Sequence, residues 1–393
     1  MKIAHVITRL IVGGAQENTI FTVEGLAKRG HQVDLITGPT TGPEGSLEQR
    51  VPASGVRLLR IRHLVRNINL ISDCLAFRKL FCLFRKERYD IIHTHSAKAG
   101  IIGRLAGRLA LPEAVVIHTI HGPSFYPYQP VMLRFLYTLA ERIAGWFTDY
   151  FICVGEVMKE TYVKAGIGQP SQYRVIYSGF DLLPYLAAET NRQTFRQRLN
   201  IREDERVIGM IGRLFPLKGQ EYLLAAFSRV ARAFPKAKLL LVGDGILRPQ
   251  LESQTERYGI QDKVIFSGLV RPEEIPEYVA VMDIVAHTSF REGLPKAVAQ
   301  GLAGGKPVVA FDVDGARELV KNGETGYLVS PGDTASLTDY LLRLLKEPEE
   351  ARSLGKTGQR LVSKLFPVEK MVEDIEALYF TAIHQRPRLS APN

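Results

Sequence analysis

Two cations in one loop are the first residues whose types and spacing could do chemistry. Arg213 and Lys218 lie in the segment GRLFPLKG, which follows an apolar run and precedes a stretch of helical periodicity. Neighbouring cations repel each other, and their burial is tolerated where a dianion lies between them. Each charge-assisted hydrogen bond to that anion would contribute about 1.5–3 kcal/mol. The pair therefore predicts a dianion site, although the segment could also be a solvated surface loop.

A second group of residues belongs to the segment SFREGLPKAVAQG. Glu292 precedes a Gly-Leu-Pro turn, and Gln300 lies on the helix expected to begin near Pro295. Both side chains could contact one elongated ligand, while the backbone N–H groups from Gly293 onward would point at an anion. Alternatively, Glu292 only caps the helix.

The glycine pair Gly13 and Gly14 separates the first apolar run from the first helical stretch. Because glycine has no side chain, the backbone can approach a ligand there, and the free N–H groups of the helix would face it. Such a turn suits a phosphate. The full G-x-G-x-x-G spacing is absent, so a plain strand-to-helix turn explains the pair equally well.

Several histidines fall at the ends of expected strands. The spacing of His118 and His121 in one strand would point their side chains to opposite faces, which argues against a shared metal. No D-x-D-like divalent site lies in a suitable place, and no nucleophile–base pair has convincing spacing. The sequence therefore predicts chemistry that uses neither a metal nor a cofactor.

The elements that must position these residues alternate along the chain. Short apolar or β-branched runs alternate with amphipathic helical stretches, first over residues 3–181 and again over 206–330. Strands that are apolar on both faces and alternate with helices predict parallel sheets covered by helices. Ligands bind at the carboxyl edge of such sheets, which is where the loop of Arg213 and Lys218 falls.

The length of the chain predicts two domains. A single core stops growing near about 250–300 residues, and this chain has 393. A polar stretch without strand signals, 187–205, marks the expected boundary. We therefore expect an α/β fold of two doubly wound Rossmann-like domains that face each other across a cleft, residues 1–187 and 188–366.

Composition and charge restrict the partners and the compartment. The chain is 46% hydrophobic and 23% charged, as in ordinary soluble proteins, and it has no apolar run long enough to span a bilayer. The three cysteines have no paired spacing, so we expect a cytoplasmic protein. The net charge of +10 predicts an anionic partner, and the excess is concentrated in 57–108, with twelve basic residues against three acids.

Four ordered segments, GGAQ, HTIHG, GRLFPLKG and EGLPKAVAQGLAGGKPVVAFDVDG, resemble the motifs of retaining glycosyltransferases of family 4. The resemblance covers essentially the whole chain. It implies the two-Rossmann GT-B architecture, with the acceptor domain first, the nucleotide-sugar domain second and a C-terminal helix, 367–384, that crosses back to the first domain. It also implies a retaining hexosyltransferase-type enzyme (EC 2.4). Such an enzyme moves a sugar from a nucleoside diphosphate sugar to a lipid-linked or polysaccharide acceptor, as in lipopolysaccharide or exopolysaccharide synthesis.

The resemblance assigns several residues to the donor. Arg213 and Lys218 match the pair that neutralises the donor diphosphate, and the backbone of Gly13 and Gly14 would face the same group. Val270 matches a position near the base. Gln300 stands where the family usually has a second glutamate that holds the ribose, and an amide can still bond a diol.

The resemblance also assigns residues to the sugar and the acceptor. Glu292, with the amides of Gly293 and Leu294, would lie near the donor sugar. His121 matches the active-site histidine near the sugar and the acceptor, and Gln16 is expected to contact the acceptor. In the mechanism usually proposed for the family, the leaving diphosphate oxygen accepts the proton of the acceptor hydroxyl.

Two other functions stay open at this point. An epimerase or a phosphorylase of the same fold is the first alternative. A non-catalytic nucleotide- or dinucleotide-binding protein is the second alternative, because Asp34 lies near the spacing of the ribose-binding acid in dinucleotide sites. Nucleic acid is not an expected partner, since aromatic and basic residues do not interleave on one face.

A peripheral membrane contact is a further hypothesis. The stretch 70–84 has apolar residues at helical spacing, which helix packing on a sheet explains by itself. Its flanking cations, Arg78, Lys79, Arg85 and Lys86, would be attracted to anionic lipid by about 1 kcal/mol each. This contact would place the first domain on the inner face of the membrane.

Overall fold

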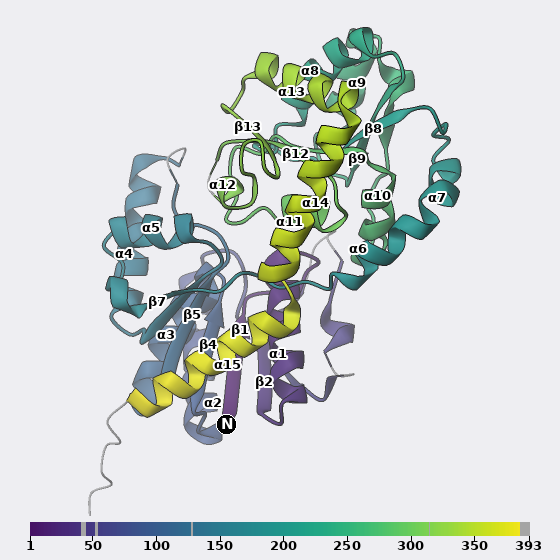
Figure 1. The fold of residues 1–393 in the computed structure, drawn as a ribbon. Helices are drawn as coiled ribbons and strands as arrows, with labels where there is room; N and C mark the ends of the chain where they lie inside the picture. Colours follow the sequence, from purple (N-terminus) through teal and green to yellow (C-terminus); the bar gives the residue numbers. More distant parts are fainter. Residues whose placement is uncertain (41–44, 52–53, 127–128, 314, 386–393) are drawn as a thin grey trace, which may run out of the picture. The chain divides into compact units, whose positions relative to one another are not determined.

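A computed structural model describes residues 1–40, 45–51, 54–126, 129–313 and 315–385 (Figure 1). The contacts divide the chain into unit 1, Met1–Phe180 with Val368–Asn393, and unit 2, Asp181–Pro367. The division precedes helix α6 (Leu183–Ala187), whereas the polar stretch 187–205 had suggested a later boundary. Helix α6 belongs to unit 2 because it packs on α10 (Ile275–Val281).

Unit 1 contains a sheet of seven parallel strands in the order β3-β2-β1-β4-β5-β6-β7. The strands are β1 (Lys2–Ile7), β2 (Gln32–Thr37), β3 (Arg57–Arg60), β4 (Ile91–His95), β5 (Val115–Ile120), β6 (Tyr150–Cys153) and β7 (Tyr173–Val175). Residues of the central strands β1 and β4 are buried on both faces, as expected of parallel strands. The strand order reverses between β1 and β4, which makes their carboxyl ends the switch point where such sheets bind ligands.

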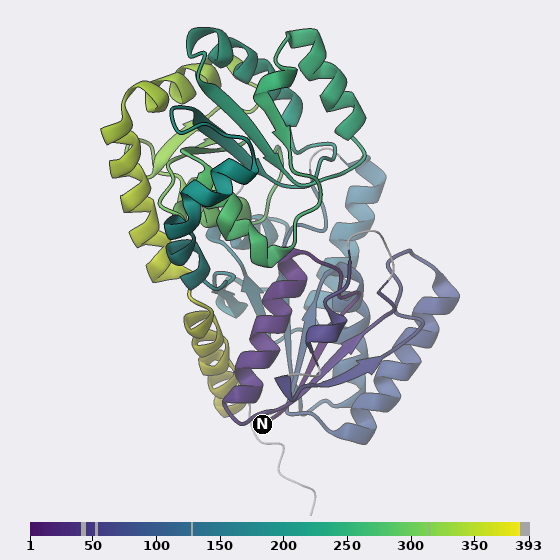
Figure 2. The same ribbon diagram turned by 90° about the vertical axis from the view of Figure 1, so that its right-hand side faces the viewer.

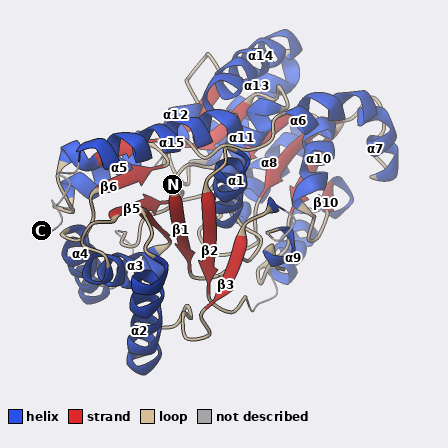
Figure 3. Ribbon diagram, turned by 90° about the horizontal axis from the view of Figure 1, so that it is seen from below, coloured by secondary structure: helices blue, strands red, loops and turns tan. Residues whose placement is uncertain are grey.

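The helices of unit 1 cover both faces of this sheet. They are α1 (Gly14–Lys28), α2 (Leu70–Glu87), α3 (Ala97–Ala110), α4 (Val131–Gly145), α5 (Glu156–Lys164) and α15 (Val368–Gln385), with single 3-10 turns at Glu48–Arg50 and Pro170–Gln172. Helices α2 and α3 lie on one face, and α1 and α15 lie side by side on the other (Figures 2 and 3). Along β1, Ile3 and Ile7 pack into the core under α1 and α15, while Ala4 and Val6 pack into the core under α2 and α3.

Unit 2 repeats the arrangement with six parallel strands in the order β10-β9-β8-β11-β12-β13. The strands are β8 (Arg206–Ile211), β9 (Ala237–Val242), β10 (Val264–Phe266), β11 (Ile284–His287), β12 (Val308–Phe311) and β13 (Gly326–Val329). The helices besides α6 and α10 are α7 (Arg192–Arg198), α8 (Gln220–Ala233), α9 (Arg248–Tyr258), α11 (Lys296–Ala303), α12 (Ala316–Leu319), α13 (Thr334–Lys346) and α14 (Pro348–Leu365), with 3-10 turns at Ala188–Asn191, Gln261–Lys263 and Pro272–Glu274. Counted within each unit, the first six strands run 3-2-1-4-5-6 in both sheets, so the predicted class of two doubly wound Rossmann-like domains is confirmed.

Candidate active site

The loop after β8 is held against the loop after β11, at the switch point of unit 2. The Thr288 hydroxyl donates to the carbonyl of Gly219 at 2.8 Å, and the Phe290 amide donates to the carbonyl of Leu217 at 2.8 Å. Gly219 has a φ of +71°, and a Cβ at this position would lie 2.1 Å from the Thr288 carbonyl oxygen. Only glycine satisfies both the conformation and the close approach. These bonds fix the place of the intervening Lys218.

Lys218 forms an ion pair with Glu292 at the centre of this edge. The ammonium lies 2.5 Å from Glu292 Oε1, and the two side chains are 26% and 18% exposed. Burial raises the pKa of Glu292, but the neighbouring His287 ring and the Lys218 ammonium outweigh burial and lower this pKa to about 2. Glu292 is therefore an ionised carboxylate at neutral pH.

This pair changes the electrostatics expected from the sequence. Arg213 and Lys218 were treated as two cations that require a dianion between them. In the structure the carboxylate of Glu292 already neutralises Lys218. The Arg213 side chain is exposed, and its guanidinium lies 5.1 Å from the centre of the Phe215 ring. An anionic ligand would therefore meet one net positive charge from these three ionic groups.

His287 is a site residue that the sequence reasoning missed. It is the last residue of β11, it is almost fully buried, and its Nε2 lies 3.5 Å from Glu292 Oε1. Neither ring nitrogen has a hydrogen-bond partner among the described residues. A polar side chain at the carboxyl end of a parallel strand is the signal that could have identified it.

The other predicted donor residues lie at the same edge of unit 2. Pro295 is the N-cap of α11, so Gly293 and Leu294 directly precede this helix, and Gln300 lies on it with 7% exposure. Val270 follows β10 and is half-buried. A hydrogen bond and ion pair bring Lys218 and Glu292 together at this edge.

The glycine pair of unit 1 lies where a helix begins without a side-chain cap. Gly13 is the N-cap of α1 and Gly14 its first residue, so the N-cap residue has no side chain that could bond the first N–H groups. A helix that begins in this way suits an anion at its N-terminus.

Gln16, two residues into α1, lines a pocket of about 620 Å³ in unit 1. The pocket has a basic side formed by Arg9, Arg66 and Lys98, and Lys98 is paired with Asp73 at 2.6 Å. The apolar wall is formed by Ile68, Ile101, Ile102, Leu133, Leu136 and Tyr137. The pocket can therefore accept a ligand that carries both an anionic group and an apolar group.

His121 follows β5, at the carboxyl edge of the unit 1 sheet. Its Nε2 lies 3.0 Å from Nδ1 of His95, and its side chain is half-buried. Burial lowers the pKa of His121 to about 4, so the ring is neutral at pH 7. As its spacing predicts, His118 lies on the opposite face of β5, where its ring contacts Thr94 and α3.

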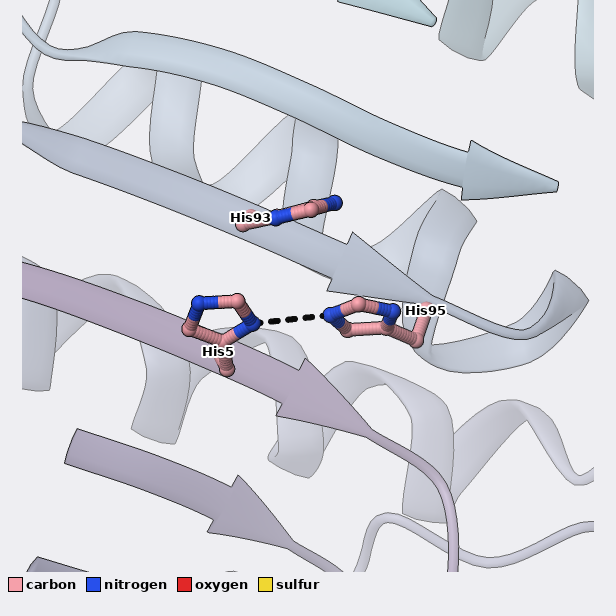
Figure 4. A group of neighbouring side chains, drawn as sticks. All are labelled: His5, His93 and His95. Carbon is pink, nitrogen blue, oxygen red and sulfur yellow. Dashed lines mark hydrogen bonds between the residues drawn. The ribbon is translucent and has the colours of Figure 1, made fainter. Parts of the chain in front are cut away.

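Three buried histidines, His5, His93 and His95, place possible metal-ligand atoms within 4.8 Å of one another (Figure 4). Their six ring nitrogens all have hydrogen-bond partners. The rings of His93 and His95 stack with their centres 4.4 Å apart and 30° between their planes, so the lone pairs, which lie in the ring planes, do not converge on one point. The arrangement fits a hydrogen-bonded cluster and does not fit a metal centre.

Two parallel Rossmann-like sheets in one chain, each with polar residues at its switch point, are typical of the GT-B class of glycosyltransferases. Sequence profiles divide the chain in the same way: "Glycosyltransferase Family 4" matches residues 12–182 and "Glycosyl transferases group 1" matches residues 191–361. The chain belongs to glycosyltransferase family 4 and is a GT-B glycosyltransferase.

Curated relatives support this assignment over the full length. The UDP-Gal:alpha-D-GlcNAc-diphosphoundecaprenol alpha-1,3-galactosyltransferase of Escherichia coli is 30% identical over 387 residues, 98% of this chain and 97% of that protein. The capsular polysaccharide biosynthesis glycosyltransferase CapM of Staphylococcus aureus is 23% identical, over 83% of this chain and 86% of that protein. The first name describes galactosyl transfer to a diphosphoundecaprenol-linked GlcNAc, and the second refers to the synthesis of a capsular polysaccharide.

Solved structures share the fold. The crystal structure of HepE from Anabaena in complex with UDP-glucose superposes with a TM-score of 0.82 at 24% identity, covering 97% of this chain and all of that one. Within the described residues, none of the helices combines the length and the apolar character needed to cross a membrane.

Proposed function

We propose that this protein transfers a hexose, with retention, from a nucleoside diphosphate sugar to a lipid-linked acceptor. The Lys218–Glu292 pair at the switch point of unit 2 carries the proposal, because it offers a cation for a diphosphate beside an ionised carboxylate for a sugar. HepE binds UDP and UDP-glucose, and the E. coli relative uses UDP-Gal by its name. These similarities support a uridine nucleotide as the donor.

In this proposal the donor diphosphate binds the loop after β8. Arg213 and Lys218 stabilise the negative charge that grows on the diphosphate as the glycosidic bond breaks. The first N–H groups of α11, beside Gly293 and Leu294, donate to the phosphate oxygens. Gln300 binds the ribose hydroxyls and Val270 packs near the base, both by analogy with the family motif.

The chemical step in this proposal uses the leaving group as the base. The bond from the anomeric carbon to the diphosphate oxygen breaks, the acceptor oxygen attacks the same face, and its proton moves to the departing diphosphate oxygen. Glu292 stabilises the positive charge that develops on the sugar, and unit 1 contributes His121 and the backbone of Gly13 and Gly14, on the strength of the family motif. The proposed step uses no bound metal, because the N–H groups at the start of α11 add to Arg213 and Lys218 in stabilising the diphosphate.

The acceptor is proposed to occupy the pocket that contains Gln16. A diphosphate-linked lipid has an anionic group for Arg9 and Arg66 and a hydrocarbon part for the apolar wall. The E. coli relative acts on a diphosphoundecaprenol-linked sugar by its name. A polysaccharide acceptor would not use the apolar wall.

A membrane surface is proposed as the place where the acceptor is met. Arg78, Lys79, Arg85 and Lys86 on α2 are all exposed, as the membrane hypothesis requires. Helix α4 offers a stronger apolar surface than α2, since Val131, Met132, Phe135, Leu136, Leu139 and Ile143 on it are exposed, followed by Trp146. We therefore propose that unit 1 rests on the inner face of the membrane through α4, with α2 adding attraction to anionic lipid.

The proposal is tested by analysing products from purified protein. The protein is incubated with UDP-galactose, UDP-glucose or their N-acetyl forms, together with a synthetic GlcNAc-diphospholipid, with and without EDTA. We expect a disaccharide lipid with α configuration, in equal yield with the chelator. A change of the nucleotide sugar without acceptor would indicate an epimerase, and a β-linked product would contradict retention.

A further inference from the structure

A chain of hydrogen bonds connects His121 with the C-terminal helix of unit 1. Nδ1 of His95 lies 3.0 Å from His121 Nε2, and Nδ1 of His5 lies 2.9 Å from His95 Nε2. The Tyr379 hydroxyl, from α15, lies 3.3 Å from His5 Nε2. His95 and His5 thus each bond through one ring nitrogen on the side of His121 and through the other on the side of Tyr379.

A branch of the chain continues from Tyr379 to β4 and β5. The tyrosine oxygen lies 2.5 Å from His93 Nδ1, and His93 Nε2 lies 2.6 Å from the Thr119 hydroxyl. Tyr379 therefore joins two series of ring nitrogens, one ending at Thr119 and one ending at His121.

The strand register explains why these residues meet. His5 pairs with His93 across β1 and β4, and alternation along a strand places His93 and His95 on the same face. That face of the sheet is covered by α1 and α15 (Figure 2). The ring planes of His5 and His95 are nearly parallel, at 16°, and Figure 4 shows the hydrogen bond that joins the two rings. The fold thus places this series of hydrogen bonds in the core.

The histidine rings in this series of hydrogen bonds are neutral. Burial lowers the pKa of His5 to about 3 and holds the pKa values of His93 and His95 well below their usual range. Burial also raises the pKa of Tyr379 well above its usual range, so its hydroxyl keeps its proton. A neutral imidazole carries a single N–H, and each hydrogen bond between two rings contains one proton.

These constraints leave two consistent arrangements of the protons. Either His5, His93, His95 and His121 all carry the proton on Nε2, or all four carry it on Nδ1. In the first arrangement the Tyr379 hydroxyl donates to His93, and in the second it donates to His5. The contact with His93 is shorter, 2.5 Å against 3.3 Å, which favours the first arrangement.

We propose that Tyr379, acting through His5 and His95, fixes the proton of His121 on Nε2 and leaves Nδ1 as a hydrogen-bond acceptor. Nδ1 of His121 bonds none of the described residues, so it can accept a hydrogen bond from a hydroxyl of the bound substrate. Tyr379, His5 and His95 are positioning residues, and His121 is the group that contacts substrate. The last point rests on the proposed glycosyltransfer, whereas the position of the proton does not.

The proton position is tested by NMR of protein labelled with ¹⁵N-histidine, without substrate. Long-range ¹H–¹⁵N spectra distinguish the two ring nitrogens, and His121→Gln identifies the His121 signals by their loss. We expect wild-type His121 to carry its proton on Nε2, and Tyr379→Phe to move its signals toward a mixture of both tautomers. Tyr173→Phe is the matched control, because Tyr173 is a buried tyrosine of unit 1 whose hydroxyl donates to the Ile167 carbonyl, outside the chain.

Transfer kinetics give the second measurement. In Tyr379→Phe we expect kcat to fall about five- to tenfold, the cost of one misdirected hydrogen bond, while KM for the nucleotide sugar stays within about twofold. Tyr173→Phe should keep its kcat at a similar loss of Tm.

Any of three spectroscopic results would overturn the inference: a proton on Nδ1 in the wild type, His121 signals that Tyr379→Phe leaves unchanged, or added Zn²⁺ that replaces the ring protons of His5 and His95. An altered tautomer with unchanged kcat would limit the chain to a structural role and also contradict the proposal. If wild-type protein transfers no sugar, the proposed function fails, and the spectra still decide the proton position.

Discussion

The two units have the same strand order but opposite chemistry at their switch points. In unit 2 the loops after β8 and β11 bring an ammonium and a carboxylate together, at Lys218 and Glu292. In unit 1 the corresponding strands, β1 and β4, carry the neutral rings of His5, His93 and His95. The same backbone architecture therefore supports one charged site and one neutral, hydrogen-bonded site.

The difference shows how each site can tolerate burial. An ion pair at the edge of a sheet stays partly hydrated, and removing one partner leaves the other charge uncompensated. Neutral rings avoid the cost of burying charge, but they must satisfy each nitrogen within the protein, which requires a long chain of partners. Unit 2 should therefore respond mainly to the loss of a charge and unit 1 mainly to the gain of one.

The largest effect is expected from the loss of a charge in unit 2. Lys218→Ala removes the cation that we propose for the donor diphosphate and takes the ammonium away from the carboxylate of Glu292. We expect kcat/KM for the nucleotide sugar to fall about 10²–10³-fold. Lys364→Ala, an exposed lysine on α14, is the control for a general loss of positive charge. Comparable activity in the two variants would remove Lys218 from the site.

Acid should destabilise unit 1 before unit 2. The folded pKa of His5 is about 3, well below that of an unfolded histidine, so the unfolded chain binds more protons and stability falls as pH drops below about 6.5. For His5 alone the free energy of unfolding decreases by about 2 kcal/mol between pH 7 and pH 5. The lowered pKa of Glu292, about 2, acts in unit 2 only below about pH 4.5, where its unfolded form begins to bind protons.

Hydrogen exchange of the native protein at pH 7 and pH 5, corrected for the intrinsic rates, measures this difference. Peptides from β1 and β4 should lose protection at pH 5, while those from β8 and β11 should keep it. Equal loss in both units would mean that the buried histidines are not responsible. His5→Phe should reduce the pH dependence of unit 1, provided that the variant folds.

Local sequence patterns were sufficient to predict the elements but not the side-chain networks. The amphipathic stretches 97–110, 156–164 and 220–233 predict helices, and α3, α5 and α8 occur at these bounds. Helix α6 was missed as the start of unit 2, since a five-residue helix has little periodicity of its own. The edge of the sheet at which the site residues lie also followed from the sequence, because the carboxyl ends of parallel strands lie at the same edge.

The missing parts of the sites depend on contacts between distant residues. Lys218 and Glu292 are 74 residues apart, and the motif assigned them to different groups of the donor. Tyr379 and His5 are 374 residues apart and meet only because α15 returns to unit 1. The histidines at strand ends were visible in the sequence, but their partners required the register and the covering helix.

The smallest effect is expected at the surface of unit 1. Phe135→Ser on α4 removes an aromatic side chain that is 57% exposed and has no role in the core. If α4 enters the lipid interface, binding to vesicles with anionic lipid should weaken about tenfold, the value of roughly 1–2 kcal/mol of apolar burial. The matched control is Leu183→Ser on α6 of unit 2; Leu183 is 73% exposed, and this variant should bind like the wild type.

Cosedimentation at low and high salt separates the two contributions, because the attraction from the α2 cations is screened by salt whereas apolar insertion persists. Equal weakening in both variants would mean that exposed apolar residues act without regard to their unit, and α4 would not be the membrane contact.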